Sequence, residues 1–252
     1  MTADSTPQPN GPRRLWWRDD DFTAYIPYFH ALEATSETLG VRPLVSAIPG
    51  AMADNFVLRD KIYCFAAHGW LHRILGCSSN RPSEYGDHRT SEEVLTELKR
   101  SRARARDLLE DSLIDWFVPP YNHMSGKHFP ALLESGFEAL CASESESHWR
   151  PLAGRMRLPH VHVDIWDYRL KRVKDPQVVE AELEAWWRRP RSSTAPLGLM
   201  THHKMMRGPE AWPAFLSLVR HLRERGWVLE DCDAGYCAAF PSSSAEACIQ
   251  PV

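Results

Sequence analysis

Three consecutive carboxylates are the feature of this sequence best suited to chemistry. Asp19, Asp20 and Asp21 follow the apolar run Leu15-Trp16-Trp17, which is typical of a buried strand. Carboxylates grouped at the end of such a strand repel one another and lose hydration. The arrangement is therefore costly unless a cation or a proton compensates it.

Two histidines four residues apart offer further ligands for such a cation. His68 and His72 follow the apolar stretch 62–67, with Gly69 between them. On a helical turn such residues share a face, so both imidazoles can reach one ion. A site of two histidines and one carboxylate leaves coordination positions open for water and substrate. It suits zinc first, with cobalt, nickel or iron as alternatives.

A hydrolase that uses such an ion needs a base, a donor for the oxyanion and an acid for the leaving group. A second aspartate of the triplet is placed to be the base. The run Thr201-His202-His203 offers two candidates for the acid, of which at most one is functional. The choice between His202 and His203 stays open at this point.

Apolar strands and amphipathic helices alternate along the chain, which predicts one parallel α/β domain, a barrel. The predicted strands end where the polar candidates stand, as active-site residues do in barrels. We expect strands at 14–19, 43–48, 62–67, 115–118, 137–142, 161–165, 197–201 and 227–230, and helices at 24–39, 90–111, 126–135, 176–188 and 209–225.

The composition indicates an ordinary globular protein, with 43% hydrophobic and 25% charged residues. A net charge of −3 gives no reason to expect a nucleic acid or a membrane surface as partner. Residues 1–13 form a polar leader without the apolar segment of a secretory signal, so we expect a cytoplasmic protein. Residues 241–252 are expected to be a disordered tail, and the oligomeric state is left open.

Cysteine spacing does not favour a disulfide framework. The chain has six cysteines, and its closest pair, Cys232 and Cys237, lacks the spacing of a redox or zinc motif. Reduced thiols are the favoured interpretation.

The first two motifs resemble those of the polysaccharide deacetylases, the carbohydrate esterases of family 4 with a NodB-homology domain. In that family a strand ends in an Asp-Asp pair, similar to Asp20-Asp21 here. The resemblance implies that Asp20 is the base and Asp21 a metal ligand. A His-(small)-x-x-His motif follows, similar to the stretch from His68 to His72, with both histidines as ligands.

Three later motifs extend the resemblance over roughly residues 14–235, within a domain that we expect at 14–240. A Pro-aromatic turn is similar to Pro120-Tyr121-Asn122, where the backbone N–H of Tyr121 would stabilise the oxyanion. A fourth motif resembles Asp164-Ile165-Trp166, whose Asp and Trp would line the substrate groove. A fifth resembles Met200-Thr201-His202, which implies that His202 is the acid. The resemblance implies a distorted, partly open parallel (β/α) barrel of about seven strands in a single domain.

The departures from the family pattern carry information. The family places an arginine beside the base where this chain has Val118, and Arg18 is the candidate replacement. Asn122 stands where the family has glycine, and asparagine also tolerates a left-handed backbone. The third aspartate permits a shift of one residue, so Asp20 remains an alternative metal ligand, and Asp19 has no assigned role.

The resemblance implies a metal-dependent hydrolase of non-peptide C–N bonds. It would remove an N-acyl group, acetyl in the first instance, from an amino sugar or related carbohydrate by attack of metal-bound water. Pro120, Asn122 and Asp164 would contact the substrate, with Trp70 and Trp166 as aromatic walls. The alternatives are a metal-dependent amidohydrolase acting on a small non-carbohydrate amide, and a non-catalytic carbohydrate-binding domain.

Overall fold

The computed structural model describes residues 12–59, 63–78, 81–143, 148–189, 195–232 and 237. The predicted tail, 241–252, and residues 1–11 of the predicted leader lie outside these ranges. The first strand begins at Arg13, one residue before the predicted start.

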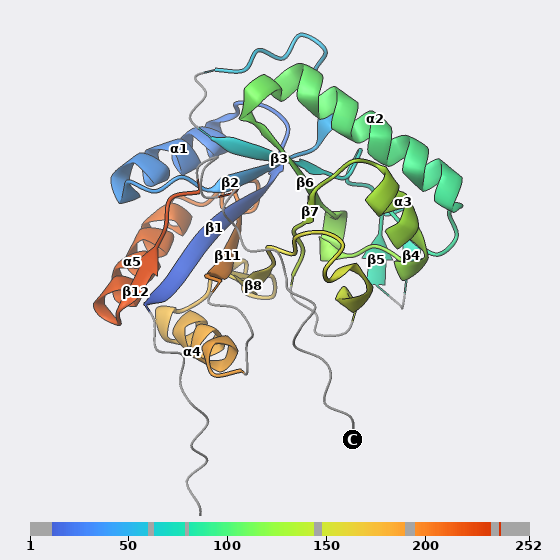
Figure 1. The fold of residues 1–252 in the computed structure, drawn as a ribbon. Helices are drawn as coiled ribbons and strands as arrows, with labels where there is room; N and C mark the ends of the chain where they lie inside the picture. Colours follow the sequence, from blue (N-terminus) through green and yellow to red (C-terminus); the bar gives the residue numbers. More distant parts are fainter. Residues whose placement is uncertain are drawn as a thin grey trace, which may run out of the picture.

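Eight parallel strands form the central sheet, and all eight were predicted from apolar runs (Figure 1). The order along the sheet is β7-β6-β3-β2-β1-β11-β8, and β12 pairs with the first half of β1. The strands are β1 (Arg13–Phe22), β2 (Leu44–Ala47), β3 (Cys64–His68), β6 (Leu113–Val118), β7 (Ala139–Leu140), β8 (Val161–Asp164), β11 (Leu197–His202) and β12 (Trp227–Leu229).

The sheet curls into a partly open barrel, as predicted. The strand β7 is only two residues long. The chain that follows it meets β8 at a parallel bridge between Ser143 and Val161, beside a hydrogen bond of 2.9 Å from the Val161 N–H to the Ala142 carbonyl. The edge strands β7 and β8 are therefore connected by a short bridge and not by a full ladder of hydrogen bonds.

Helices cover the outside of the curled sheet, with α1 and α5 side by side and α2 running over β3 and β6 (Figure 1). Thr90 and Glu93 form a capping box that begins α2. Gly40 ends α1 in the left-handed conformation, with φ of 63°. The helices are α1 (Pro27–Leu39), α2 (Ser91–Leu109), α3 (Phe129–Glu134), α4 (Pro176–Trp187) and α5 (Ala211–Glu224).

Short elements lie in the loops that follow the strands. Two antiparallel hairpins are present, β4 (Gly76–Ser78) with β5 (Arg81–Ser83), and β9 (Trp166–Asp167) with β10 (Arg172–Val173). Single 3-10 turns are η1 (Pro49–Ala51), η2 (Glu110–Ser112), η3 (Pro120–Asn122), η4 (Gly126–His128) and η5 (Arg150–Leu152).

Alternation along β1 sorts its side chains between two cores. The odd-numbered residues Leu15 and Trp17 belong to the large core between sheet and helices. Trp16 belongs to a smaller core inside the barrel, where Arg18 is also buried. The same alternation places Asp19 toward the helices and Asp20 toward the barrel interior.

Four of the cysteines, Cys64, Cys141, Cys232 and Cys237, belong to the smaller core and are free thiols. The Cys232 and Cys237 sulfur atoms are 3.3 Å apart without a covalent bond. The reduced state of the cysteines stays a prediction, and Cys248 lies outside the described ranges.

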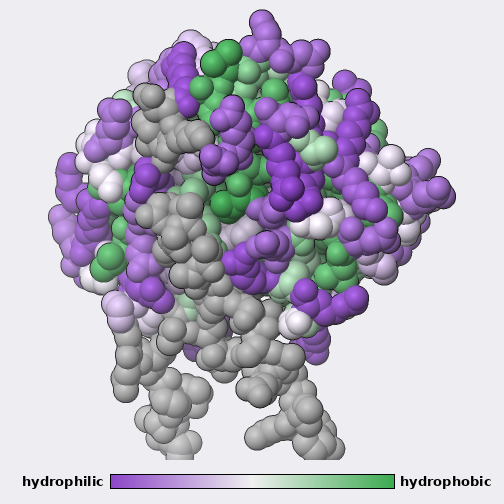
Figure 2. Space-filling model, turned by 45° about the horizontal axis from the view of Figure 1, so that its top comes forward, coloured by the Kyte–Doolittle hydropathy of each residue, from purple (hydrophilic) through white to green (hydrophobic). Residues whose placement is uncertain are grey.

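Hydrophilic side chains cover most of the face shown in Figure 2, with smaller hydrophobic areas between them. The segment of α2 from Lys99 to Arg106 is rich in basic residues. Several of them form ion pairs with acidic residues outside the helix. Lys99 meets Glu134, Arg104 meets Asp54, and Asp115 meets Arg102 and Arg106. Among the described residues, no helix is long and apolar enough to cross a membrane.

Candidate metal centre and active site

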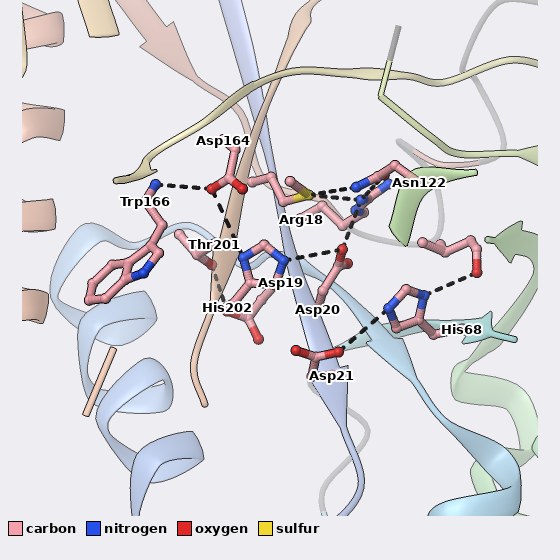
Figure 3. A network of polar contacts seen from close by, with 12 residues as sticks. Arg18, Asp19, Asp20, Asp21, His68, Asn122, Asp164, Trp166, Thr201 and His202 are labelled. Atoms are coloured by element: carbon pink, nitrogen blue, oxygen red, sulfur yellow. Dashed lines mark hydrogen bonds and ion pairs between the residues drawn. The ribbon is translucent and has the colours of Figure 1, made fainter. Parts of the chain in front are cut away.

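Asp21, His68 and His72 converge on one point at the carboxyl end of the sheet. Each offers a ligand atom, and these atoms lie within 4.8 Å of one another. The Nε2 atoms of His68 and His72 are 3.6 Å and 3.4 Å from Asp21 Oδ1. Figure 3 shows His68 on β3 pointing toward Asp21 at the end of β1. The structure thus brings together the three side chains that the sequence predicted as ligands.

Backbone contacts orient His68 for a metal. Its Nδ1 donates a hydrogen bond of 3.0 Å to the Val118 carbonyl, which leaves Nε2 facing Asp21. A backbone acceptor on the distal nitrogen is the usual way in which a ligating histidine is held. His68 is the last residue of β3, and Val118 is the last residue of the neighbouring strand β6.

The prediction that His68 and His72 share a helical face is wrong. His68 ends a strand, and His72 lies in the following loop with φ of 55°. The rings still meet, with centroids 4.7 Å apart. The loop reverses at Gly69, whose φ is 63°, and this turn replaces the helical turn in bringing both imidazoles to Asp21.

Arg18 and Asp20 form a fully buried ion pair, 2.8 Å from Nη2 to Oδ2. The guanidinium also donates to Asn122 Oδ1 at 2.6 Å and to the Cys141 carbonyl at 2.9 Å. Burial opposes ionisation of Asp20, but Arg18, with His68 and His202, outweighs it and lowers the pKa of the carboxyl. Arg18 therefore stands where a cation was expected beside the predicted base, and it reaches Asp20 from β1 itself.

One oxygen of the Asp20 carboxylate makes no hydrogen bond within the described part of the chain. Oδ1 is buried and has no hydrogen-bond partner among the described residues, whereas Oδ2 holds Arg18. The carboxylate is thus fixed by one oxygen and presents the other, as a group that receives a proton must.

Asp19, which the sequence left without a role, is a structural anchor. It is fully buried and accepts hydrogen bonds from Thr201 Oγ1 at 2.6 Å and from the backbone N–H and Nδ1 of His203 at 3.1 Å and 2.5 Å. Burial raises the pKa of Asp19, and His203 opposes that rise. The contact turns His203 toward the helix layer, where its ring packs against Phe29 of α1.

His202 faces the opposite way, toward the other catalytic candidates. Its Nε2 is 4.0 Å from Asp20 Oδ2, and its Nδ1 is 3.9 Å from Asp164 Oδ1. Figure 3 shows the ring between the two carboxylates. Of the two adjacent histidines, His202 is therefore the one that the structure places with Asp20.

The Pro120-Tyr121-Asn122 turn has two consecutive residues in the left-handed region, with φ of 60° at Tyr121 and 51° at Asn122. Asp21 and His72 also have positive φ, so four of the six such non-glycine residues described gather at this site. Backbone strain of this kind concentrates at functional sites, where surrounding contacts maintain it. The Tyr121 hydroxyl supplies one of these contacts by donating to the His72 carbonyl at 2.9 Å.

The two tryptophans predicted as aromatic walls are placed elsewhere. Trp166 is 5% exposed and belongs to the large core, and its ring points away from Asp20 and Asp21 in Figure 3. The Trp70 ring lies under the Arg100 guanidinium at 4.1 Å, on the side of α2. Trp166 is taken into the core, as bulky aromatic side chains often are, whereas Trp70 is only partly buried and packs against the arginine.

Tyr168 is the exposed aromatic at the site, and the sequence analysis missed it. It stands in the β9–β10 turn and is 57% exposed. Its hydroxyl donates to Asp164 Oδ2 at 2.8 Å, and its ring centroid is 6.2 Å from that of His202. The Trp166 backbone N–H holds the other Asp164 oxygen at 2.9 Å, so the motif contributes its main chain and not its ring.

The ligand group fits a divalent transition metal by its donor chemistry. Burial and the neighbouring His68 lower the pKa of His72 to about 4, so this imidazole is neutral and able to ligate at pH 7. Burial opposes ionisation of Asp21, but bonding to His68 prevails and holds the pKa of the carboxyl below its usual range. One carboxylate and two imidazoles are a ligand set typical of zinc and of non-haem iron sites.

Solved structures share this fold. No protein-family model matches the chain, and a search of curated proteins gives no match. A CE4-family pseudoenzyme from Bacillus anthracis matches with a TM-score of 0.55 and 11% identity over 88% of this chain and 64% of its own. A peptidoglycan N-acetylglucosamine deacetylase matches with a TM-score of 0.56 and 13% identity over 88% of both chains.

A family 4 acetyl xylan esterase from Clostridium thermocellum, solved with a cobalt ion, matches with a TM-score of 0.52 and 10% identity over 86% of this chain and 87% of its own. Against the pseudoenzyme structures this chain spans about two thirds of their length. The chain therefore has the fold of the CE4 polysaccharide deacetylases.

Proposed function

We propose that this protein is a divalent-metal-dependent deacetylase that removes an N-acyl group, acetyl in the first instance, from an amino sugar or related carbohydrate. The observation that carries the proposal is the convergence of Asp21, His68 and His72 beside Asp20, which the same strand presents with Arg18 as its buried partner. No nucleic-acid or membrane partner is part of the proposal.

Asp21, His68 and His72 would hold the ion, with zinc as the first choice and cobalt, nickel or iron as alternatives. When bound, the metal supplies a Lewis acid that polarises the acyl carbonyl and lowers the pKa of water.

Asp20 acts as the general base in this proposal. Its Oδ2 is fixed by Arg18, and its buried Oδ1 has no hydrogen-bond partner among the described side chains. The low pKa of Asp20 keeps the carboxylate ionised, so Oδ1 can accept the proton of the attacking water at neutral pH.

His202 protonates the departing amine. It lies on β11, next to β1 in the sheet, with Nε2 toward Asp20 and Nδ1 toward Asp164. The donors Tyr168 and Trp166 fix the Asp164 carboxylate, whose Oδ1 lies 3.9 Å from His202 Nδ1, beyond hydrogen-bond distance. The Tyr121 backbone N–H is the candidate donor to the oxyanion, held by the left-handed turn of η3.

Tyr168 favours a carbohydrate over a small amide as the substrate. An exposed ring beside the acid can stack on a sugar, whereas a small amide would not reach beyond the catalytic groups. We expect Tyr168→Ala to raise KM for an N-acetylated oligosaccharide about tenfold, the loss of one aromatic contact, and to leave KM for a small N-acetyl amide unchanged. Tyr168→Phe, which retains the ring, is the matched control.

The deciding experiment is acetate release from N-acetylated oligosaccharides, monosaccharides and small amides by the chain with measured metal content. Turnover of sugars with zinc or cobalt, lost in Asp20→Asn, supports the proposal. Turnover of small amides alone would instead favour the amidohydrolase. A chain that binds metal and oligosaccharide but releases no acetate would be a carbohydrate-binding domain, like the pseudoenzyme of the same fold in its lack of activity.

A further inference from the structure

The loop between His68 and His72 packs directly against a buried acid, Glu84. Gly69 has φ of 63°, and a Cβ on it would lie 2.2 Å from Glu84 Oε2 and 2.3 Å from Pro120 Cγ. Only glycine can occupy this position. Gly69 therefore has no side chain that could form a hydrogen bond with the loop backbone. Residues from other segments must supply those bonds.

The Glu84 carboxylate supplies that support with both of its oxygens. Oε2 accepts a hydrogen bond of 3.0 Å from the Trp70 N–H, and Oε1 accepts one of 2.8 Å from the Leu71 N–H. Glu84 is 1% exposed. Burying a carboxylate is costly unless hydrogen bonds compensate it, so its presence beneath this loop requires a reason.

The carbonyl groups of the same loop are held by three other elements. The Ser101 hydroxyl on α2 donates to the Gly69 carbonyl at 2.5 Å, and the Gly50 N–H of η1 donates to the Trp70 carbonyl at 2.9 Å. The Tyr121 hydroxyl of η3 holds the His72 carbonyl. Glu84 is the one charged group in this set, and it alone fixes two consecutive N–H groups.

The hydrogen bonds to Glu84 matter for the site because His72 has a positive φ. A non-glycine residue in the left-handed region is strained, and the strain persists only where neighbours over-determine the backbone. Without the two bonds to Glu84, the two residues before His72 can relax. The imidazole would then leave its position 3.4 Å from Asp21.

We propose that Glu84 positions the backbone of residues 69–72, here called the metal loop. Through this loop it sets the affinity of the Asp21–His68–His72 site for its ion. The inference rests on the proposed metal-dependent function. Glu84 acts through the backbone of residues 70 and 71 and does not contact the reacting atoms.

The test is the zinc affinity of the full-length Glu84→Gln variant, measured by competition with a chromophoric chelator. Glutamine has the same shape, but its NH₂ group would face one of the two loop N–H groups, so one bond is lost and two donors oppose each other. We expect zinc to bind 10- to 100-fold more weakly, the effect typical of groups that orient metal ligands. Hydrogen exchange of the Trp70 and Leu71 amides in the metal-free variant should also be faster than in the wild type.

Glu180→Gln is the matched control, because it makes the same substitution at a partly buried carboxylate that pairs with His221 and Arg225 and not with the loop. Its zinc affinity should equal that of the wild type. Equal zinc affinity in the Glu84→Gln variant and the wild type would overturn the positioning role. Absence of zinc binding by the wild type would instead overturn the proposed function, and the amide exchange would still report whether Glu84 holds the loop.

Discussion

At the scale of single residues, strand geometry divides the aspartate triplet into three roles. Side chains alternate across β1, so Asp19 meets His203 in the helix layer and Asp20 meets Arg18 inside the barrel. The ladder between β1 and β2 is irregular between Asp19 and Phe22, and Asp21 there has φ of 78°. This irregularity frees Asp21 from the alternation and lets it face the histidines.

Two single substitutions, Asp20→Asn and Asp21→Asn, distinguish the proposed base from the proposed metal ligand. Asp20→Asn should lower kcat by about 10²- to 10⁴-fold, as expected for loss of a general base, and leave zinc affinity unchanged. Asp21→Asn should lose zinc binding and activity together. Metal content and turnover of the two purified variants are the measurements. The opposite pattern would mean that Asp20 is the ligand, the alternative that the sequence left open.

The Arg18–Asp20 pair makes a second prediction at this scale. Both side chains are fully buried, so Arg18→Met leaves an unpaired carboxylate in the barrel. We expect a loss of about 3–5 kcal/mol in the free energy of unfolding, the usual cost of breaking a buried pair from one side. Urea denaturation measures it.

The double variant Arg18→Met with Asp20→Asn is the control, because it removes the unpaired charge and should recover most of the loss. An Arg18→Met chain as stable as the wild type would show that the guanidinium does not compensate Asp20.

At the scale of elements, Asp115 ties α2 to the sheet. It lies on β6 and accepts hydrogen bonds from Arg102 Nε and Nη2 at 2.9 Å each and from Arg106 Nη2 at 2.5 Å. Burial opposes ionisation of Asp115, but the two arginines prevail and lower its pKa. The helix that these contacts position also carries Ser101, which holds the metal loop.

Asp115→Asn should therefore destabilise the fold by about 1.5–3 kcal/mol at pH 7, the range for hydrogen bonds to charged groups. A pKa lowered by folding contributes stability above the unfolded value, about 3.9, and that contribution is lost as the pH falls through the folded value. The difference between variant and wild type should shrink below about pH 4. Urea denaturation between pH 3 and 7 measures it, and a difference that grows on acidification would contradict the assignment.

The elements differ in how far the sequence could predict them. All eight strands could be predicted, several of them because parallel strands covered on both faces are continuous apolar runs. The loop at His72 could not, because a spacing of four fits a helical turn equally well, and the turn depends on Glu84 and Ser101, distant in the chain. The candidate histidines and aspartates could be identified by residue type. The position of Tyr168 could not, because the sequence does not show which aromatic rings pack in the core and which stay exposed.

At the scale of the whole molecule, the curled sheet brings the candidate groups together. Asp20 and Asp21 end β1, His68 ends β3, and His202 ends β11, all at the same edge because the strands are parallel. The contacts His68–Asp21 and His202–Asp20 bring β3 and β11 to the same end of β1, although β3 and β11 are separated in the sequence by more than a hundred residues. An ion held here would join β1 to β3 and the loop after it, and β1 and β3 are not neighbours in the sheet.

Zinc should therefore stabilise the native molecule as a whole. At a free zinc concentration about 100-fold above Kd, binding to the native state contributes about 2.7 kcal/mol, which for a domain of this size raises Tm by about 5–10 °C. Thermal unfolding followed by circular dichroism, with and without zinc, measures the shift. His68→Ala should abolish it, and His221→Ala, which alters a histidine paired with Glu180 outside the site, should retain it. Equal shifts in the wild type and His68→Ala would mean that zinc acts elsewhere on the chain.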